Sequence, residues 1–153
     1  MAIAVTIETT IARPPAEVFA RVADIDAWPS WLIASGIVRV DRSSDDPLVE
    51  GERLTVEQRA AGREGTFDAK VTALVPPTRF ALTGRDGDGV SIDIDAELAS
   101  TEGHDRTNLR WSIRIGLPLR YRMFESMARP QVERAAALDI EALKLRLEST
   151  PAD

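Results

Sequence analysis

The strongest constraint on the fold is a change of hydrophobic period along the chain. Between residues 35 and 115, apolar side chains recur at every second position, which is typical of half-buried β-strands. From residue 121 to 148 they recur with a helical period, over an arc wider than the roughly 100° stripe of a surface helix. We therefore expect a long C-terminal helix that packs in the hollow of a curved antiparallel sheet.

One hairpin in this pattern fixes its own register. Residues 90–98 and 109–115 each alternate apolar and polar side chains on either side of a turn. A register that opposes Ala96 to Trp111 pairs apolar residues on one face and acidic residues with arginines on the other. We predict that the two segments pair in this register.

The N-terminal part adds one strand and two short helices. Residues 3–11 alternate as a strand, and Pro14 and Pro15 end it because proline donates no backbone hydrogen bond. An amphipathic helix over residues 16–24 and a short turn over residues 28–32 follow. The order predicts an α+β fold: a curved antiparallel sheet of about seven strands wrapped around a long C-terminal helix, with two short helices after strand 1.

Two segments resemble a known superfamily. Residues 15–19 (PAEVF) and 24–32 (DIDAWPSWL) are similar to the beginning of START-like helix-grip proteins, in the polyketide cyclase/dehydrase and lipid-transport branch (SRPBCC). Residues 138–148 resemble the closing helix of that family, and the likeness covers nearly the whole chain. It implies a helix-grip fold with an internal cavity. The superfamily includes lipid and hormone carriers, polyketide cyclases and chaperone-linked regulators, and the fold alone does not separate them.

Composition excludes several kinds of chemistry and partner. The chain of 153 residues has no cysteine and one histidine, which excludes disulfides, thiolate catalysis and any site with two imidazoles from one chain. A net charge of -6 disfavours nucleic acid as a partner. We see neither a basic leader with an apolar stretch nor an apolar run approaching roughly 18 residues, so we expect a cytoplasmic protein without integral membrane contact.

The domain organisation is expected to be simple. We predict a single helix-grip domain over residues 1–150 and a disordered tail over residues 151–153. The expected oligomeric state is a monomer or a weak homodimer.

The inward faces of sheet and helix define the candidate ligand site. We expect a small hydrophobic ligand, lipid-like or aromatic, to bind between them. Any one of these residues alone fits an ordinary core better than a pocket, but the family resemblance favours a cavity for the group. The predicted ligand-binding residues are Trp28 and Trp31 near the mouth, Leu54, Val56, Gln58, Phe67, Ala69, Phe80, Leu82, Ile92, Ile94 and Trp111 on the sheet, and Tyr121, Phe124, Met127, Ala128 and Gln131 on the helix.

Three functions remain open at this stage. A carrier or sensor of a hydrophobic molecule needs only apolar contacts. A cyclase or dehydratase acting on polyketones needs an acid or base in the pocket, and the inward positions offer only Gln58, Gln131, Tyr121 and Arg53. A protein-binding regulator would use either the patch of seven arginines between residues 106 and 134 or an open edge of the sheet.

We predict no catalytic residue, no metal site and no cofactor. The segment Asp86-Gly87-Asp88-Gly89 is similar to the start of a calcium loop, but Val90 stands at the fifth position, where an oxygen ligand is needed. A hairpin turn is the better interpretation of that segment.

Overall fold

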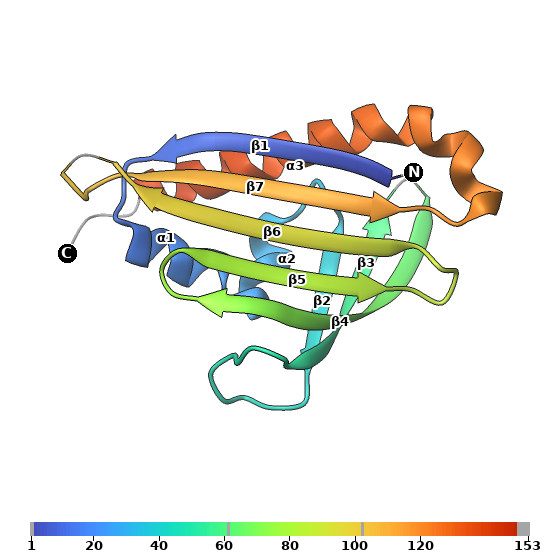
Figure 1. The fold of residues 1–153 in the computed structure, drawn as a ribbon, viewed down its shortest axis with the longest axis horizontal. Helices are drawn as coiled ribbons and strands as arrows, with labels where there is room; N and C mark the ends of the chain where they lie inside the picture. Colours follow the sequence, from blue (N-terminus) through green and yellow to red (C-terminus); the bar gives the residue numbers. More distant parts are fainter. Residues whose placement is uncertain (1, 61, 102, 150–153) are drawn as a thin grey trace.

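The chain folds around one strongly twisted antiparallel sheet. The structure is a computed structural model that describes residues 2–60, 62–101 and 103–149 (Figure 1). Within these residues the strand order is β1-β7-β6-β5-β4-β3-β2. The strands are β1 (Ala2–Ile11), β2 (Ile37–Arg42), β3 (Arg53–Ala60), β4 (Arg63–Val75), β5 (Arg79–Arg85), β6 (Ser91–Ser100) and β7 (Thr107–Gly116).

Helices form in the two places that the sequence predicted, between the first two strands and after the last strand. The chain between β1 and β2 forms α1 (Pro15–Val22), the 3₁₀ turn η1 (Ile25–Ala27) and α2 (Trp28–Trp31). After β7 the 3₁₀ turn η2 (Leu119–Phe124) leads into α3 (Glu125–Ser149), which contains Pro130. In Figure 1, β2 and β3 run across the direction of β1 and β7, and α3 lies behind β1. The predicted α+β helix-grip arrangement is confirmed.

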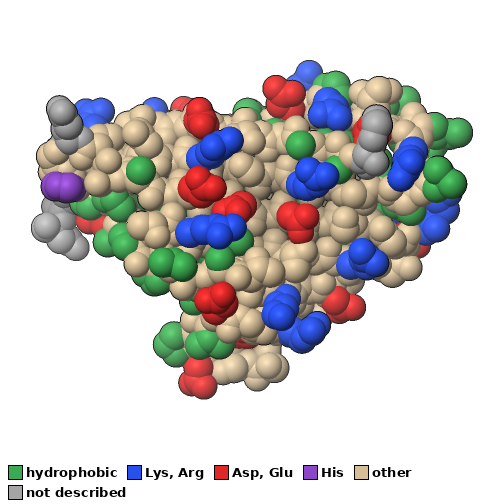
Figure 2. Space-filling model, in the orientation of Figure 1, with side chains coloured by type: hydrophobic (Ala, Val, Ile, Leu, Met, Phe, Trp, Pro, Cys, Tyr) green, Lys and Arg blue, Asp and Glu red, His purple; other side chains and the backbone are tan. Residues whose placement is uncertain are grey.

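The register predicted for the β6–β7 hairpin is confirmed. Ala96 opposes Trp111, and Glu97 opposes Arg110. The ion pairs on the outer face, however, form with other strands: Arg110 Nε lies 3.7 Å from Glu8 Oε1 of β1, and Arg79 Nη2 of β5 lies 2.8 Å from a carboxylate oxygen of β6. Figure 2 shows these red and blue side chains interleaved over the sheet.

The helix α3 is buried along one stripe only. Its buried side chains begin at the middle of the helix and continue toward its C-terminal end: Ala136, Asp139, Ile140, Leu143 and Leu147. Leu138 and Leu145, by contrast, are 57% and 59% exposed. The wide apolar arc is therefore not enclosed on all sides, because the sheet contacts the helix from one side and leaves the opposite side in water.

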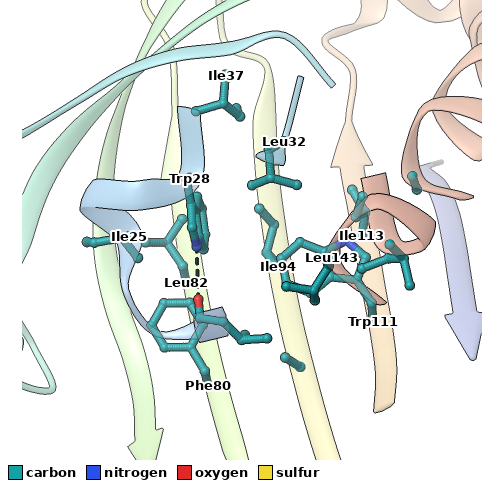
Figure 3. Close-up of a cluster of buried hydrophobic side chains, with 14 of the residues drawn as sticks. Ile25, Trp28, Leu32, Ile37, Phe80, Leu82, Ile94, Trp111, Ile113 and Leu143 are labelled. Carbon is teal, nitrogen blue, oxygen red and sulfur yellow. Dashed lines mark hydrogen bonds between the residues drawn. The ribbon is translucent and has the colours of Figure 1, made fainter. Parts of the chain in front are cut away.

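Aromatic rings fill the centre of the core (Figure 3). Trp28 of α2 meets Phe80 of β5 and Trp111 of β7 edge-on, at centroid distances of 5.8 and 6.2 Å. Its indole nitrogen donates a 2.9 Å hydrogen bond to the carbonyl oxygen of Val22 at the end of α1. These contacts hold both short helices against the sheet, since edge-to-face ring pairs add to the free energy of apolar burial.

Two carboxylates fasten α3 to loops near the N-terminus. Asp139, which is 2% exposed, accepts hydrogen bonds of 2.8 Å from the backbone N–H groups of Ala34 and Ser35. Glu148 Oε2 accepts one of 2.9 Å from the N–H of Ala12. Both carboxylates lie in the half of α3 that is buried.

Two further sequence expectations concern the ends of the chain and membranes. The tail predicted at residues 151–153 lies outside the described residues. Among the residues that are described, no helix combines the length and the apolar character needed to cross a bilayer.

Replacing Asp139 tests the attachment of α3. Asp139→Ala leaves two backbone N–H groups without their acceptor, and we expect the free energy of unfolding to fall by about 2 kcal/mol. The exposed Glu141 of the same helix is the control, and Glu141→Ala should change stability by less than about 0.5 kcal/mol. Urea unfolding followed by tryptophan fluorescence measures both. Equal losses for the two variants would contradict this role of Asp139.

Candidate ligand-binding site

Sheet and helix enclose a hollow that their side chains do not fill. It consists of a larger chamber of about 510 Å³ and a smaller chamber of about 230 Å³. Both chambers are lined by Gln58 of β3, Ile92 of β6, Ile115 of β7, and Ala128 and Val132 of α3. Because they share these walls, the two chambers lie side by side between the sheet and α3.

The hollow exists because the first half of α3 packs loosely on the sheet. Facing the cavity, this half carries two alanines, Ala128 and Ala135, among the larger residues Met127, Gln131 and Val132. The second half carries Ile140, Leu143 and Leu147, which fill the core. Preceding α3, the turn η2 has no buried residue. The cavity therefore lies under η2 and the N-terminal part of α3, next to the tightly packed core under the C-terminal part.

The larger chamber reaches the surface at η2. Tyr121, Phe124 and Met127 form part of its wall, and Phe124 and Met127 are 49% and 65% exposed. The smaller chamber extends toward the core, where Ile94 and Trp111 line it. A ligand entering past η2 would meet progressively more buried apolar side chains.

The structure brings together part of the predicted ligand-binding set. The residues of that set that line the cavity are Gln58, Phe67, Ile92, Ile94, Trp111, Tyr121, Phe124, Met127, Ala128 and Gln131. The remaining residues line neither chamber and are packed in the core: Trp28, Trp31, Leu54, Val56, Ala69, Phe80 and Leu82. The alternation of apolar and polar residues identified the inward face of each strand. It does not show at which positions along a strand the helix packs directly on the sheet and at which a cavity separates them.

Trp28 and Trp31 correct the expected position of the mouth. We placed both near the opening, whereas they are 0% and 1% exposed and pack against Phe80 and Trp111. The physical reason is that α1 and α2 pack against the concave face of the sheet away from η2 and cover it there (Figure 1). The opening lies instead at η2.

Several lining residues were not selected from the sequence. Ile113 and Ile115 share the inward face of β7 with Trp111, so the alternation already contained that signal. Arg63, at the start of β4, gave no signal, because an arginine beside a hairpin turn fits a solvated position equally well. It is the one cationic side chain among the described residues that line the cavity.

Arg63 is held by two carboxylates at the cavity wall. Its Nη2 atom lies 2.6 Å from Asp86 Oδ2 and 2.9 Å from Asp88 Oδ2, in the turn between β5 and β6. Asp86 also accepts 2.9 Å hydrogen bonds from the backbone N–H groups of Asp88 and Val90. Burial opposes ionisation of Asp86, but these hydrogen bonds outweigh it and hold its pKa below the ordinary value.

The other polar groups of the cavity are uncharged. Gln58 Nε2 donates a 2.7 Å hydrogen bond to the carbonyl oxygen of Ser35, which leaves its own amide oxygen as an acceptor. Gln131 and Tyr121 line the larger chamber, and Ser35 and Trp111 line the smaller one. Within the part of the chain that the structure describes, no group of three or more acidic or histidine side chains is arranged to hold a metal ion.

Comparison with known proteins identifies the family. The family described as polyketide cyclase/dehydrase and lipid transport matches residues 2–148. No curated protein matches the sequence. Two solved structures with a TM-score of 0.76 are the aromatase/cyclase Zhui from Streptomyces sp. R1128, at 16% identity over 97% of this chain and 94% of that chain, and TTHA0849 from Thermus thermophilus, at 13% identity over 97% and 99%.

A third solved structure is a START superfamily protein from Mycobacterium smegmatis. It has a TM-score of 0.71 and 16% identity, over 95% of this chain and 97% of that chain. At these identities the likeness shows a shared fold and does not transfer a ligand or a reaction.

The pairing of Asp86 with Arg63 predicts a pH-dependent stability. Because the folded-state pKa of Asp86 is lowered, its contribution is fully present above the unfolded-state pKa of about 4 and is lost as the pH falls through the folded-state value. We expect Asp86→Asn to be less stable than the unaltered chain by about 1 kcal/mol at neutral pH. The difference should shrink below about pH 4.

Urea unfolding at a series of pH values measures this difference. The exposed Asp45 provides the control, because Asp45→Asn should follow the unaltered chain at every pH. A difference between Asp86→Asn and the unaltered chain that stays constant with pH would contradict the assignment.

Proposed function

Since the chain belongs to the polyketide cyclase/dehydrase and lipid-transport family, we propose that it binds and carries a small hydrophobic ligand in the cavity between sheet and α3. The proposal rests on the larger chamber of about 510 Å³, which is lined mainly by apolar side chains and adjoins a second chamber. Pockets for small organic ligands commonly have volumes of roughly 300–1,000 Å³. A lipid-like or aromatic molecule fits that chemistry.

The lining supports binding through apolar contact with a few orienting polar groups. Ile92, Ile115 and Val132 offer hydrocarbon surface, and a guest that covers it removes that surface from water. Tyr121 and Gln131 can hydrogen-bond to a polar group of the guest in the larger chamber. The ligand that these walls favour is therefore largely apolar, with one or two oxygen atoms toward the η2 end.

A second candidate is a cyclase or dehydratase acting on polyketones. The polar groups of Arg63, Tyr121 and Gln131 share the larger chamber, where they could hydrogen-bond to the carbonyl oxygens of such a chain. The structural neighbour Zhui is named as an aromatase/cyclase. Among the described lining residues there is neither a carboxylate nor an imidazole, so Tyr121 would have to transfer the proton. Carrying a ligand requires no proton-transferring group, and we therefore favour the carrier over the enzyme.

The two candidates separate by experiment. Incubation with a poly-β-carbonyl compound should return it unchanged if the protein only binds it, whereas a cyclase would release an aromatic product. Loss of that product in Tyr121→Phe, with binding retained, would establish the enzyme and displace the carrier.

Filling the cavity tests ligand binding directly. Ala128 borders both chambers, and Ala128→Phe places a ring in the space that they share. We expect the affinity for the neutral dye N-phenylnaphthylamine to fall by about tenfold or more, because the guest and the new ring compete for one volume. Fluorescence titration of the dye measures the affinity.

The matched control is Ala137→Phe, an exposed position on the same helix. It should bind the dye as the unaltered chain does. Circular dichroism must show that both variants are folded; should Ala128→Phe fail to fold, Ala135→Leu, which narrows the smaller chamber, takes its place. Undiminished dye binding in the folded cavity variant would refute the proposed site.

A further inference from the structure

A short segment at the cavity opening exposes large apolar side chains to water. Leu119 and Met123 are 78% and 79% exposed, the highest values among the described large apolar residues. Phe124 and Met127 follow them at 49% and 65%. All four lie within η2 and the first turn of α3, and we refer to them together as the protrusion. Clusters of this kind on a protein surface mark sites of interaction.

Arginines surround this protrusion. Arg120, Arg122 and Arg129 lie within residues 119–129, and Glu125 is the only acidic residue there. The segment is thus cationic in a chain whose net charge is -6. Figure 2 shows blue and green side chains side by side at the end of the molecule where η2 and the start of α3 lie.

Two of the arginines are held in place around the protrusion. The guanidinium of Arg120 lies 4.9 Å from the centre of the Tyr121 ring and donates a hydrogen bond to the carbonyl oxygen of Asp88. Arg129 Nη2 donates a 3.4 Å hydrogen bond to the carbonyl oxygen of Ala2. Both cations therefore stay beside the apolar side chains.

The protrusion is continuous with the interior of the cavity. Phe124 and Met127 are exposed on the outside and also line the larger chamber. An apolar molecule could pass along these two side chains from the surface into the chamber without losing hydrocarbon contact.

We propose that residues 119–129 dock on the surface of an anionic lipid bilayer. Apolar side chains that protrude from a basic segment enter the boundary between headgroups and acyl chains, while the arginines bind lipid phosphates. The exposed apolar side chains and the local positive charge of this segment match such a surface. Docking places the cavity opening against the lipid, so the proposal adds a partner and an orientation to the proposed ligand carriage and does not depend on it.

Vesicle flotation with the full chain tests the docking. We expect binding to vesicles of phosphatidylcholine mixed with phosphatidylglycerol, weaker binding to phosphatidylcholine alone, and release as salt is raised. The double variants Leu119→Ser with Met123→Ser, and Arg122→Glu with Arg129→Glu, should each reduce binding to the mixed vesicles by about tenfold or more. None of these four residues lines the cavity.

Matched controls lie at the other end of the molecule. The double variant Leu138→Ser with Leu145→Ser in the second half of α3, and the single variant Arg106→Glu in the β6–β7 turn, make changes of the same kind away from η2, and both should bind vesicles normally (Figure 1). Dye binding in the cavity, measured on every variant, should stay unchanged, which separates failure of docking from failure of ligand binding. Absent or charge-independent binding by the unaltered chain, or equal losses in the controls, would overturn the proposal and favour a protein partner for this surface.

Discussion

The sheet packs tightly against the C-terminal part of α3 and loosely against its N-terminal part, and this difference determines where the cavity lies. The second half of the helix is anchored by Ile140, Leu143 and Leu147 in the core and by the hydrogen bonds of Asp139 to the loop before β2. The first half turns Ala128 and Ala135 toward the sheet beside Met127, Gln131 and Val132, and none of these side chains is fully buried. A helix held firmly at one end and loosely at the other leaves space between the layers, and that space is the cavity.

The opening of the cavity is organised by one acidic turn. Asp88, between β5 and β6, contacts Arg63 of β4 through its carboxylate and Arg120 of η2 through its backbone carbonyl. This turn therefore connects the sheet wall of the larger chamber to the segment that precedes α3. Because η2 has no buried residue of its own, polar contacts such as that of Arg120 with Asp88 help to hold it in place. The charges at the opening thus have a structural role before any ligand is considered.

Sequence alone predicted the fold better than the site. Alternation with charge complementarity fixed the pairing of Ala96 with Trp111, because a shift by one residue would have exposed the apolar face. The same alternation selected Ile92 and Leu82 alike, yet only Ile92 lines the cavity. Whether an inward side chain meets a ligand depends on the distance between helix and sheet at its level. That distance is set by long-range packing, such as the burial of Trp28 against Phe80, which no local pattern encodes.

We propose that an apolar guest occupies the space between the sheet and the first half of α3. A crystal structure of the protein soaked with iodonaphthalene tests it most directly, because the anomalous signal of iodine locates the guest. We expect an iodine peak between Ile92 and Ala128, which line both chambers. Iodine bound only on the outer face of the sheet, in the open groove of about 690 Å³ beside Glu8 and Arg110, would contradict this assignment.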